Sequence, residues 1–256
     1  MMTGSAALLL LGLGCGPSDP PGTVSAAPRT GLPGPSAPAA ERLRRGAELE
    51  AADRLAEAAA EFRSVLAQDG TNVDALTGLG RVASRMGDAS SALAFLRRAV
   101  ELRPRDGSLR NHHAALLAMS GRREEAEAEF TRAAALAPDD PQIPLNAALN
   151  LADLGRWDEA RARARRAAEL LPKDPTPWMV LGRLEARQGR PLQALPHFEK
   201  AGELGPEVEL VQYHLAKARL AAGQKAGAEA PLRKVLAGKV SAEIRAEAEA
   251  LLAGLR

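Results

Sequence analysis

The sequence predicts an all-α protein, an α-solenoid of six helix–turn–helix repeats, and two observations support this prediction. A set of alanines recurs every 34 residues without a slip, at Ala58, Ala92, Ala126, Ala160, Ala194 and Ala228. Aromatic residues make up only 3% of the chain, whereas Ala, Leu, Arg and Glu are abundant. That composition favours helices and supplies few of the β-branched and aromatic residues that strands prefer.

The chain opens with an apolar run, MMTGSAALLLLGLG, directly before Cys15, its single cysteine. The run is too short to span a bilayer as a helix, which takes about 20 apolar residues, but it suits the apolar region of a signal peptide. One cysteine cannot form an internal disulfide. Leu-Gly-Leu-Gly-Cys resembles the lipobox of bacterial lipoproteins, which implies that residues 1–15 are a signal segment and that Cys15 is lipidated. Gly12 and the lack of a preceding Lys or Arg depart from that pattern.

Residues 16–38 contain seven Pro and four Gly and almost no apolar bulk. Such a segment cannot bury enough surface to offset the entropy of ordering it, so it is predicted to be a disordered linker. A lipid anchor, a tether and a folded domain would then follow one another. The alternative is a plain disordered tail on a cytoplasmic protein.

Other marks stand at fixed distances from the alanines. Five residues before each alanine is a turn residue: Asp53, Gly87, Gly121, Gly155, Gly189 or Gly223. Twelve before is a small residue: Gly46, Gly80, Ala114, Ala148, Gly182 or Ala216. Four after comes Phe62, Leu96, Phe130, Ala164, Phe198 or Leu232. The small residues suit a close helix crossing, and the turn glycines suit a left-handed helix end.

These marks resemble the tetratricopeptide repeat, a 34-residue helix–turn–helix unit. The resemblance covers residues 39–240 and implies a right-handed α-solenoid of six such repeats. Residues 241–256 are predicted to form a C-terminal capping helix that starts at Ser241 as N-cap. Its apolar stripe is Ile244, Ala248, Leu251, Leu252 and Leu255.

Two departures from the repeat pattern give local expectations. Repeat one carries Arg42 and Arg45 where inner repeats place apolar residues, so we expect its outer face to meet water. Pro196 and Pro231 lie several residues into second helices, which we expect to begin late or kink there.

The resemblance also implies a concave groove, lined by the first helices, that receives a protein or peptide ligand. Its basic flanks would be Arg81, Arg85, Arg183, Arg187 and Lys217, with Tyr213 beside the last. Its floor would be Asn111, Ala115, Met119, Leu145, Leu149, Ala152 and Asp153. Because Arg forks onto carboxylates and Asn pairs with peptide backbone, the groove suits an acidic peptide. The alternative is the ordinary solvated face of an Arg-rich protein.

Nothing in the sequence favours catalysis or nucleic acid. The 34 basic and 32 acidic residues nearly balance, and stacking aromatics are scarce. His113 falls at an inward position usually filled by Leu, which favours a core histidine, and no histidine has a metal-ligand partner at helical spacing. Cys15 has no preorganised base beside it. We therefore expect no enzyme, no metal, no cofactor and no small-molecule substrate.

Taken together, the sequence predicts a non-catalytic scaffold for protein–protein interaction, lipid-anchored in the bacterial envelope and facing the periplasm. Anchor, tether and repeats resemble the outer-membrane lipoproteins that assist type IV pilus secretin assembly, and other envelope lipoproteins of this repeat class. The process of complex assembly rests on that analogy alone. The alternative is a soluble cytoplasmic adaptor with residues 1–38 as a tail.

Overall fold

The computed structural model describes residues 38–255, which form thirteen α-helices and, within that range, no strand. Cys15 and nearly all of the predicted linker lie outside the described residues. No helix within 38–255 has the length and apolar character needed to cross a membrane. The chain divides into two compact units, one that ends at Pro138 and one from Asp139 to Arg256.

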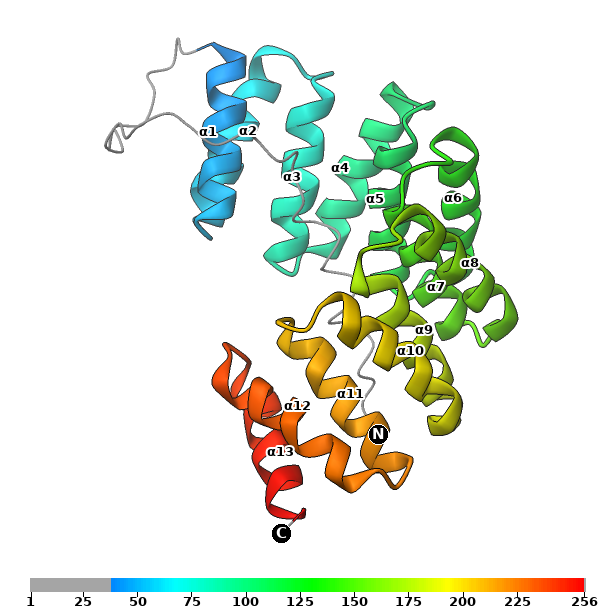
Figure 1. Ribbon diagram of the computed structural model, residues 1–256. Helices are drawn as coiled ribbons and strands as arrows, with labels where there is room; N and C mark the ends of the chain where they lie inside the picture. The colour runs from blue at the N-terminus through cyan, green and yellow to red at the C-terminus, as the bar shows by residue number, and fades with distance from the viewer. Residues whose placement is uncertain (1–37, 256) are drawn as a thin grey trace. The chain divides into compact units, whose positions relative to one another are not determined.

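The first unit contains three helix pairs, visible from blue to green in Figure 1. The pairs are α1 (Ala39–Ala51) with α2 (Leu55–Gln68), α3 (Val73–Arg85) with α4 (Ala89–Leu102), and α5 (Gly107–Met119) with α6 (Arg123–Leu136). Within the unit, each second helix also packs against the first helix of the next pair. Asn72, Asp88 and Asp106 cap the starts of α3, α4 and α5 through their side chains.

The second unit repeats this plan and adds one helix. Its pairs are α7 (Gln142–Asp153) with α8 (Trp157–Leu170), α9 (Pro175–Arg187) with α10 (Pro191–Leu204), and α11 (Glu209–Ala221) with α12 (Lys225–Ala237). The final helix α13 (Ala242–Ala253) packs on α12. Ser241 accepts a hydrogen bond from the Ile244 amide at 3.3 Å, which confirms the predicted N-cap. Ala248 is buried and the rest of the stripe packs around it.

The small residues that recur at fixed positions in each repeat lie where their size predicts, between closely crossing helices. All six alanines of the 34-residue series are 0% exposed. A Cβ on Gly46 would come within 2.7 Å of the Phe62 ring, and one on Gly182 within 2.7 Å of the Phe198 ring. The two helices of a repeat can therefore cross closely only where these residues are small.

The turns between paired helices use the left-handed conformation. Gly87, Gly121, Gly155, Gly189 and Gly223 all have φ between 71° and 80°. Asp53 takes the same place in repeat one with φ of 61°, at a steric cost that glycine avoids.

The expectation for Arg42 was wrong, and so was the expectation that the helices containing Pro196 and Pro231 begin late. Arg42 does not meet water: it is 5% exposed and its Nη1 donates to Glu61, itself 3% exposed, at 2.9 Å. The helices that contain Pro196 and Pro231 do not begin late, because α10 starts at Pro191 and α12 at Lys225, in step with the other second helices. Burial of Ala194 and Phe198 on the same helix face offsets the local cost of proline in α10.

Candidate functional site

The predicted groove residues divide between the two units. In the first unit, Arg81 on α3 forks onto the Glu50 carboxylate of α1, with distances of 3.1 and 2.8 Å. Arg85, one turn later, donates to Asp53 at 2.8 Å and to the Glu50 carbonyl at 2.5 Å. Both arginines therefore already have partners on the preceding repeat and are less available to a ligand.

The predicted floor residues are mostly covered. Asn111, Ala115 and Leu145 are buried, each at 6% exposure or less. Leu149 is partly buried and packs against the apolar core of the second unit. Met119 is 38% exposed, and it offers a flexible apolar contact in the first unit.

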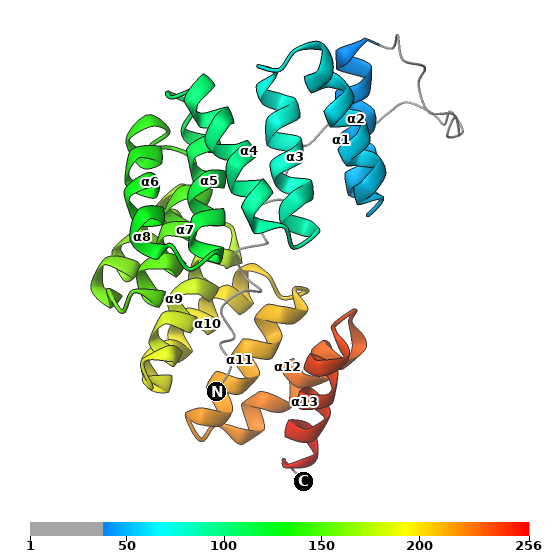
Figure 2. The same cartoon turned by 180° about the vertical axis from the view of Figure 1, so that it is seen from behind.

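The second unit brings Arg183, Arg187 and Lys217 together at one pocket of about 610 Å³ between α9 and α11. Figure 2 shows these two helices with α10, which supplies the pocket's inner wall. Most of the wall is apolar and is formed by Ala186, Pro191, Ala194, Phe198, Ala218 and Ala221. Among residues 38–255, no acidic side chain lines this pocket.

His214 of α11 completes the pocket and was not predicted. Its ring stacks on Phe198, with ring centroids 5.5 Å apart and planes 8° apart. Burial, together with the charges of Arg183 and Lys217, lowers the pKa of His214 to about 4. The imidazole is therefore neutral at pH 7, and the pocket's positive charge comes from the three long side chains.

Two of these cations form ion pairs with acidic residues on neighbouring helices. Arg187 of α9 donates to Asp153 of α7 at 2.8 Å, and its guanidinium lies 5.4 Å from the Trp157 ring centroid. On the other side, Lys217 of α11 donates to Glu247 of α13 at 2.7 Å. Tyr213, another predicted groove residue, is buried and donates to the same carboxylate at 2.5 Å.

Arg183 differs from the other two cations because no described carboxylate lies within ion-pair distance of it. Burial lowers the pKa of Arg183, and repulsion from Arg187 lowers it further, while the charge of Asp153 acts in the opposite direction. Its Nη1 atom is shielded from water and has no hydrogen-bond partner among residues 38–255. Leaving a buried donor unpaired costs on the order of 1–3 kcal/mol, and more when the group is charged.

Sequence reasoning missed His214, Phe198 as a pocket wall, and Glu247 as the partner of Lys217. Glu247 had a detectable signal: it stands 34 residues after Tyr213, so the repeat register continues into α13. His214 had none, because its position next to Tyr213 gives no hint of stacking on another repeat. Among the described residues, no three metal-binding side chains gather into a cluster.

Stacked helix pairs that present a cationic pocket on their first helices define a helical-repeat protein of the interaction class. The chain belongs to the tetratricopeptide repeat family, whose models match residues 49–116, 145–209 and 179–243. Comparison with curated proteins gives no match.

Several solved structures share the fold. PilW, a type IV pilus biogenesis factor, is 20% identical, with a TM-score of 0.71 over 82% of this chain and 97% of PilW. PilF from Pseudomonas aeruginosa is 15% identical, with a TM-score of 0.67 over 83% of this chain and 96% of PilF. YrrB, a repeat protein with an unusual peptide-binding site, is 21% identical, with a TM-score of 0.53 over 68% of this chain and 90% of YrrB.

Proposed function

We propose that this protein is a non-catalytic scaffold whose second unit binds an acidic peptide segment of its partner in the pocket between α9 and α11. The proposal rests on the pattern of ion pairs that join neighbouring helices of the second unit. Acidic residues join α7 to α9 through Asp153 and α11 to α13 through Glu247. Between α9 and α11, the described residues that line the pocket include three cations and no acid.

A ligand carboxylate would supply the missing negative charge. Arg183 offers a planar guanidinium that can donate two parallel hydrogen bonds to it, and Lys217 stands on the facing helix. The apolar wall around Phe198 would take a neighbouring apolar side chain of the same segment. A segment in which acidic and apolar residues alternate therefore fits the pocket best.

The first experiment measures fluorescence anisotropy of a labelled peptide, acetyl-Leu-Glu-Leu-Glu-Leu-amide, with the full chain. Arg183→Gln should weaken binding about tenfold, the loss expected for one charge-assisted contact, and added salt should weaken binding by the unmodified chain. Arg233→Gln is the matched control, since Arg233 is exposed on α12 and pairs with Glu229 on the same helix. Equal binding of the Gln-for-Glu peptide, or of the Arg183→Gln protein, would refute the proposal.

The proposal extends to lipid anchoring through Cys15 in the bacterial envelope, facing the periplasm, where the scaffold would assist assembly of a larger complex. The fold shared with PilW and PilF supports this by analogy. Metabolic labelling with a fatty-acid probe tests it: label and membrane fractionation should be lost in Cys15→Ala. An unlabelled, soluble unmodified protein would instead support the cytoplasmic adaptor.

A further inference from the structure

The first unit has a pocket of its own on the face formed by its second helices. It has a volume of about 570 Å³ and lies between α4 and α6, with α5 as its floor. Leu93 and Arg97 come from α4, His113 and Leu117 from α5, and Glu125 and Glu129 from α6. This site shares no residue with the pocket between α9 and α11.

His113 is the unusual residue of this pocket. The sequence predicts a core histidine, but the side chain is only partly buried and lines the open pocket. Its Nδ1 is shielded from water and has no hydrogen-bond partner among the described residues. Burial lowers the pKa of His113, and Arg122, Arg110 and Arg97 oppose its protonation while Glu129 favours it. A neutral imidazole surrounded mainly by positive charge suits an anionic ligand.

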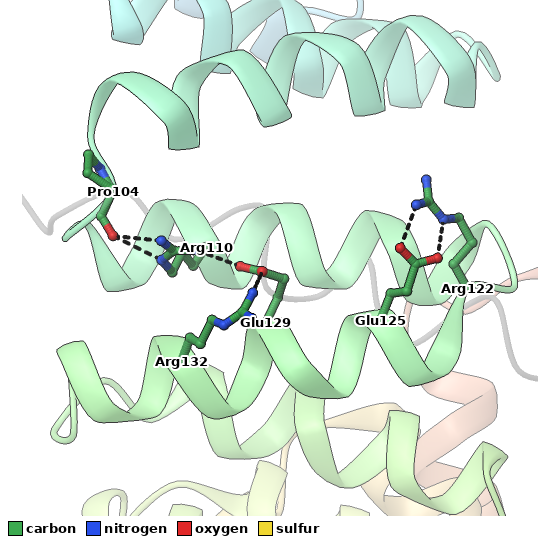
Figure 3. A network of polar contacts seen from close by, with 6 residues as sticks. All are labelled: Pro104, Arg110, Arg122, Glu125, Glu129 and Arg132. Carbon is green, nitrogen blue, oxygen red and sulfur yellow. Dashed lines mark hydrogen bonds and ion pairs between the residues drawn. The ribbon is translucent and has the colours of Figure 1, made fainter.

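The two acidic residues of the pocket are already neutralised, as Figure 3 shows. Glu129 accepts from Arg110 at 2.7 Å and from Arg132 at 2.5 Å. Burial alone would raise the pKa of Glu129, but these two arginines outweigh burial and lower it. Glu125 accepts two hydrogen bonds from Arg122, at 2.7 and 2.6 Å. Neither carboxylate is therefore left to repel an incoming anion strongly.

Of the arginines that line this pocket, Arg97 has the longest and most exposed ion pair. Its one ion pair, with Glu101 of the same helix, measures 3.9 Å, and both side chains are more than half exposed. Such a contact contributes little and gives way readily to a better partner. The guanidinium of Arg97 can therefore turn to a ligand at the pocket that it lines.

We infer that this pocket binds an acidic side chain, Asp or Glu, of a partner protein. The ligand carboxylate accepts hydrogen bonds from Arg97 and from an N–H of His113. Its methylene stem packs against Leu93 and Leu117, which flank those two residues in the lining. The scaffold would then hold acidic groups at two separate places, one in each unit.

The four histidines of the chain allow a direct test by NMR of the full, histidine-labelled protein. The probe is acetyl-glutamate amide, with acetyl-glutamine amide as its neutral counterpart, and the His113 signals are assigned with His113→Asn. The glutamate probe should shift the His113 ring resonances saturably, with a Kd in the millimolar range, and should raise the pKa of His113. A nearby carboxylate favours the imidazolium form.

Two arginines on α4 form the matched pair of variants. Arg97→Gln should weaken the response of His113 about tenfold. Arg98→Gln should leave it unchanged, because Arg98 is also more than half exposed, pairs with the same Glu101 at 3.2 Å and does not line the pocket. Equal thermal unfolding of the two variants excludes a folding defect as the cause.

The inference is overturned if His113 does not respond to the glutamate probe, responds equally to the glutamine probe, or loses its response equally in both variants. The second pocket has its own reporter, since His214 lines it. Arg183→Gln should weaken the response of His214 about tenfold and leave that of His113 intact. The two sites can therefore fail independently.

Discussion

Arg187 donates a hydrogen bond to Asp153, a residue 34 positions earlier, at 2.8 Å, so one ion pair joins the first helices of two successive repeats. Arg183 lies one helical turn before Arg187 on the same helix and forms no such pair with any described residue. One arginine thus holds two repeats together, whereas its neighbour has no carboxylate within ion-pair distance among residues 38–255. This difference predicts opposite effects of the same substitution at the two positions.

Arg183→Met should stabilise the second unit by about 1 kcal/mol, because it replaces a desolvated, unpaired guanidinium with an apolar chain of similar length. It should also abolish binding of the acidic peptide. Arg187→Met should instead destabilise the unit, since it removes the ion pair that Arg187 forms with the largely covered Asp153. Urea unfolding followed by tryptophan fluorescence measures both, because the two tryptophans, Trp157 and Trp178, lie in this unit. Equal losses of stability would mean that Arg183 is a structural residue.

His214 should make the stability of the second unit depend on pH. Its pKa is about 4 in the folded chain, against about 6.5 when unfolded. Between these values the unfolded chain binds more protons, so stability is full above about pH 6.5 and falls as the pH drops toward 4. The total loss is on the order of 3 kcal/mol. The lowered pKa of His197 acts in the same direction in this unit, and the lowered pKa of His113 does so in the first unit.

The variant His214→Phe isolates this contribution, because phenylalanine can keep the stack on Phe198 without titrating. Urea midpoints measured from pH 7 to pH 4 should fall less steeply for the variant than for the unmodified protein. Parallel curves would show that His214 titrates normally in the folded state.

The buried pair Arg42–Glu61 should be sensitive to loss of the carboxylate. Glu61 also lies 3.5 Å from Arg45, so it balances the charge of two arginines. Glu61→Gln should destabilise the first unit by about 3 kcal/mol, because it removes the buried carboxylate that Arg42 contacts at 2.9 Å. Glu57→Gln, which removes an exposed pair with Arg54 on the same helix, should have little effect. Far-UV circular dichroism during urea unfolding compares them, and similar losses for both would contradict the burial of Arg42.

The 34-residue register made the fold readable from the sequence because each mark reflects a contact inside one repeat or with the next one. Ala58 and its equivalents are small wherever two helices cross, so spacing alone reveals them. Charge pairing is harder to predict from spacing, because an arginine such as Arg81 forms its ion pair with a carboxylate about one repeat away in the sequence. Glu50 neutralises Arg81, while no described carboxylate lies within ion-pair distance of Arg183. The expectation for Arg42 failed because its partner Glu61 lies 19 residues away, on the second helix of the same repeat.

The left-handed turns give the last prediction: removing glycine from one of them should lower stability, whereas introducing glycine at another should not. Gly121 has φ of 80°, and a Cβ there would meet nothing within 4 Å, so Gly121→Ala costs backbone strain alone, about 1 kcal/mol. Gly70→Ala is the control, because Gly70 is not left-handed and its Cβ would make an ordinary 3.8 Å contact. That variant should be neutral or slightly stabilising.

Asp53→Gly makes the reverse change at the equivalent turn of repeat one. Glycine relieves the backbone strain of a left-handed aspartate. The substitution also removes the ion pair with Arg85, in which the Asp53 side chain is 81% exposed. Because such exposed pairs contribute little, Asp53→Gly should leave stability unchanged or raise it. Far-UV circular dichroism during thermal unfolding compares the three variants. A marked loss in Asp53→Gly would show that Arg85 depends on this carboxylate to join α3 to the preceding repeat.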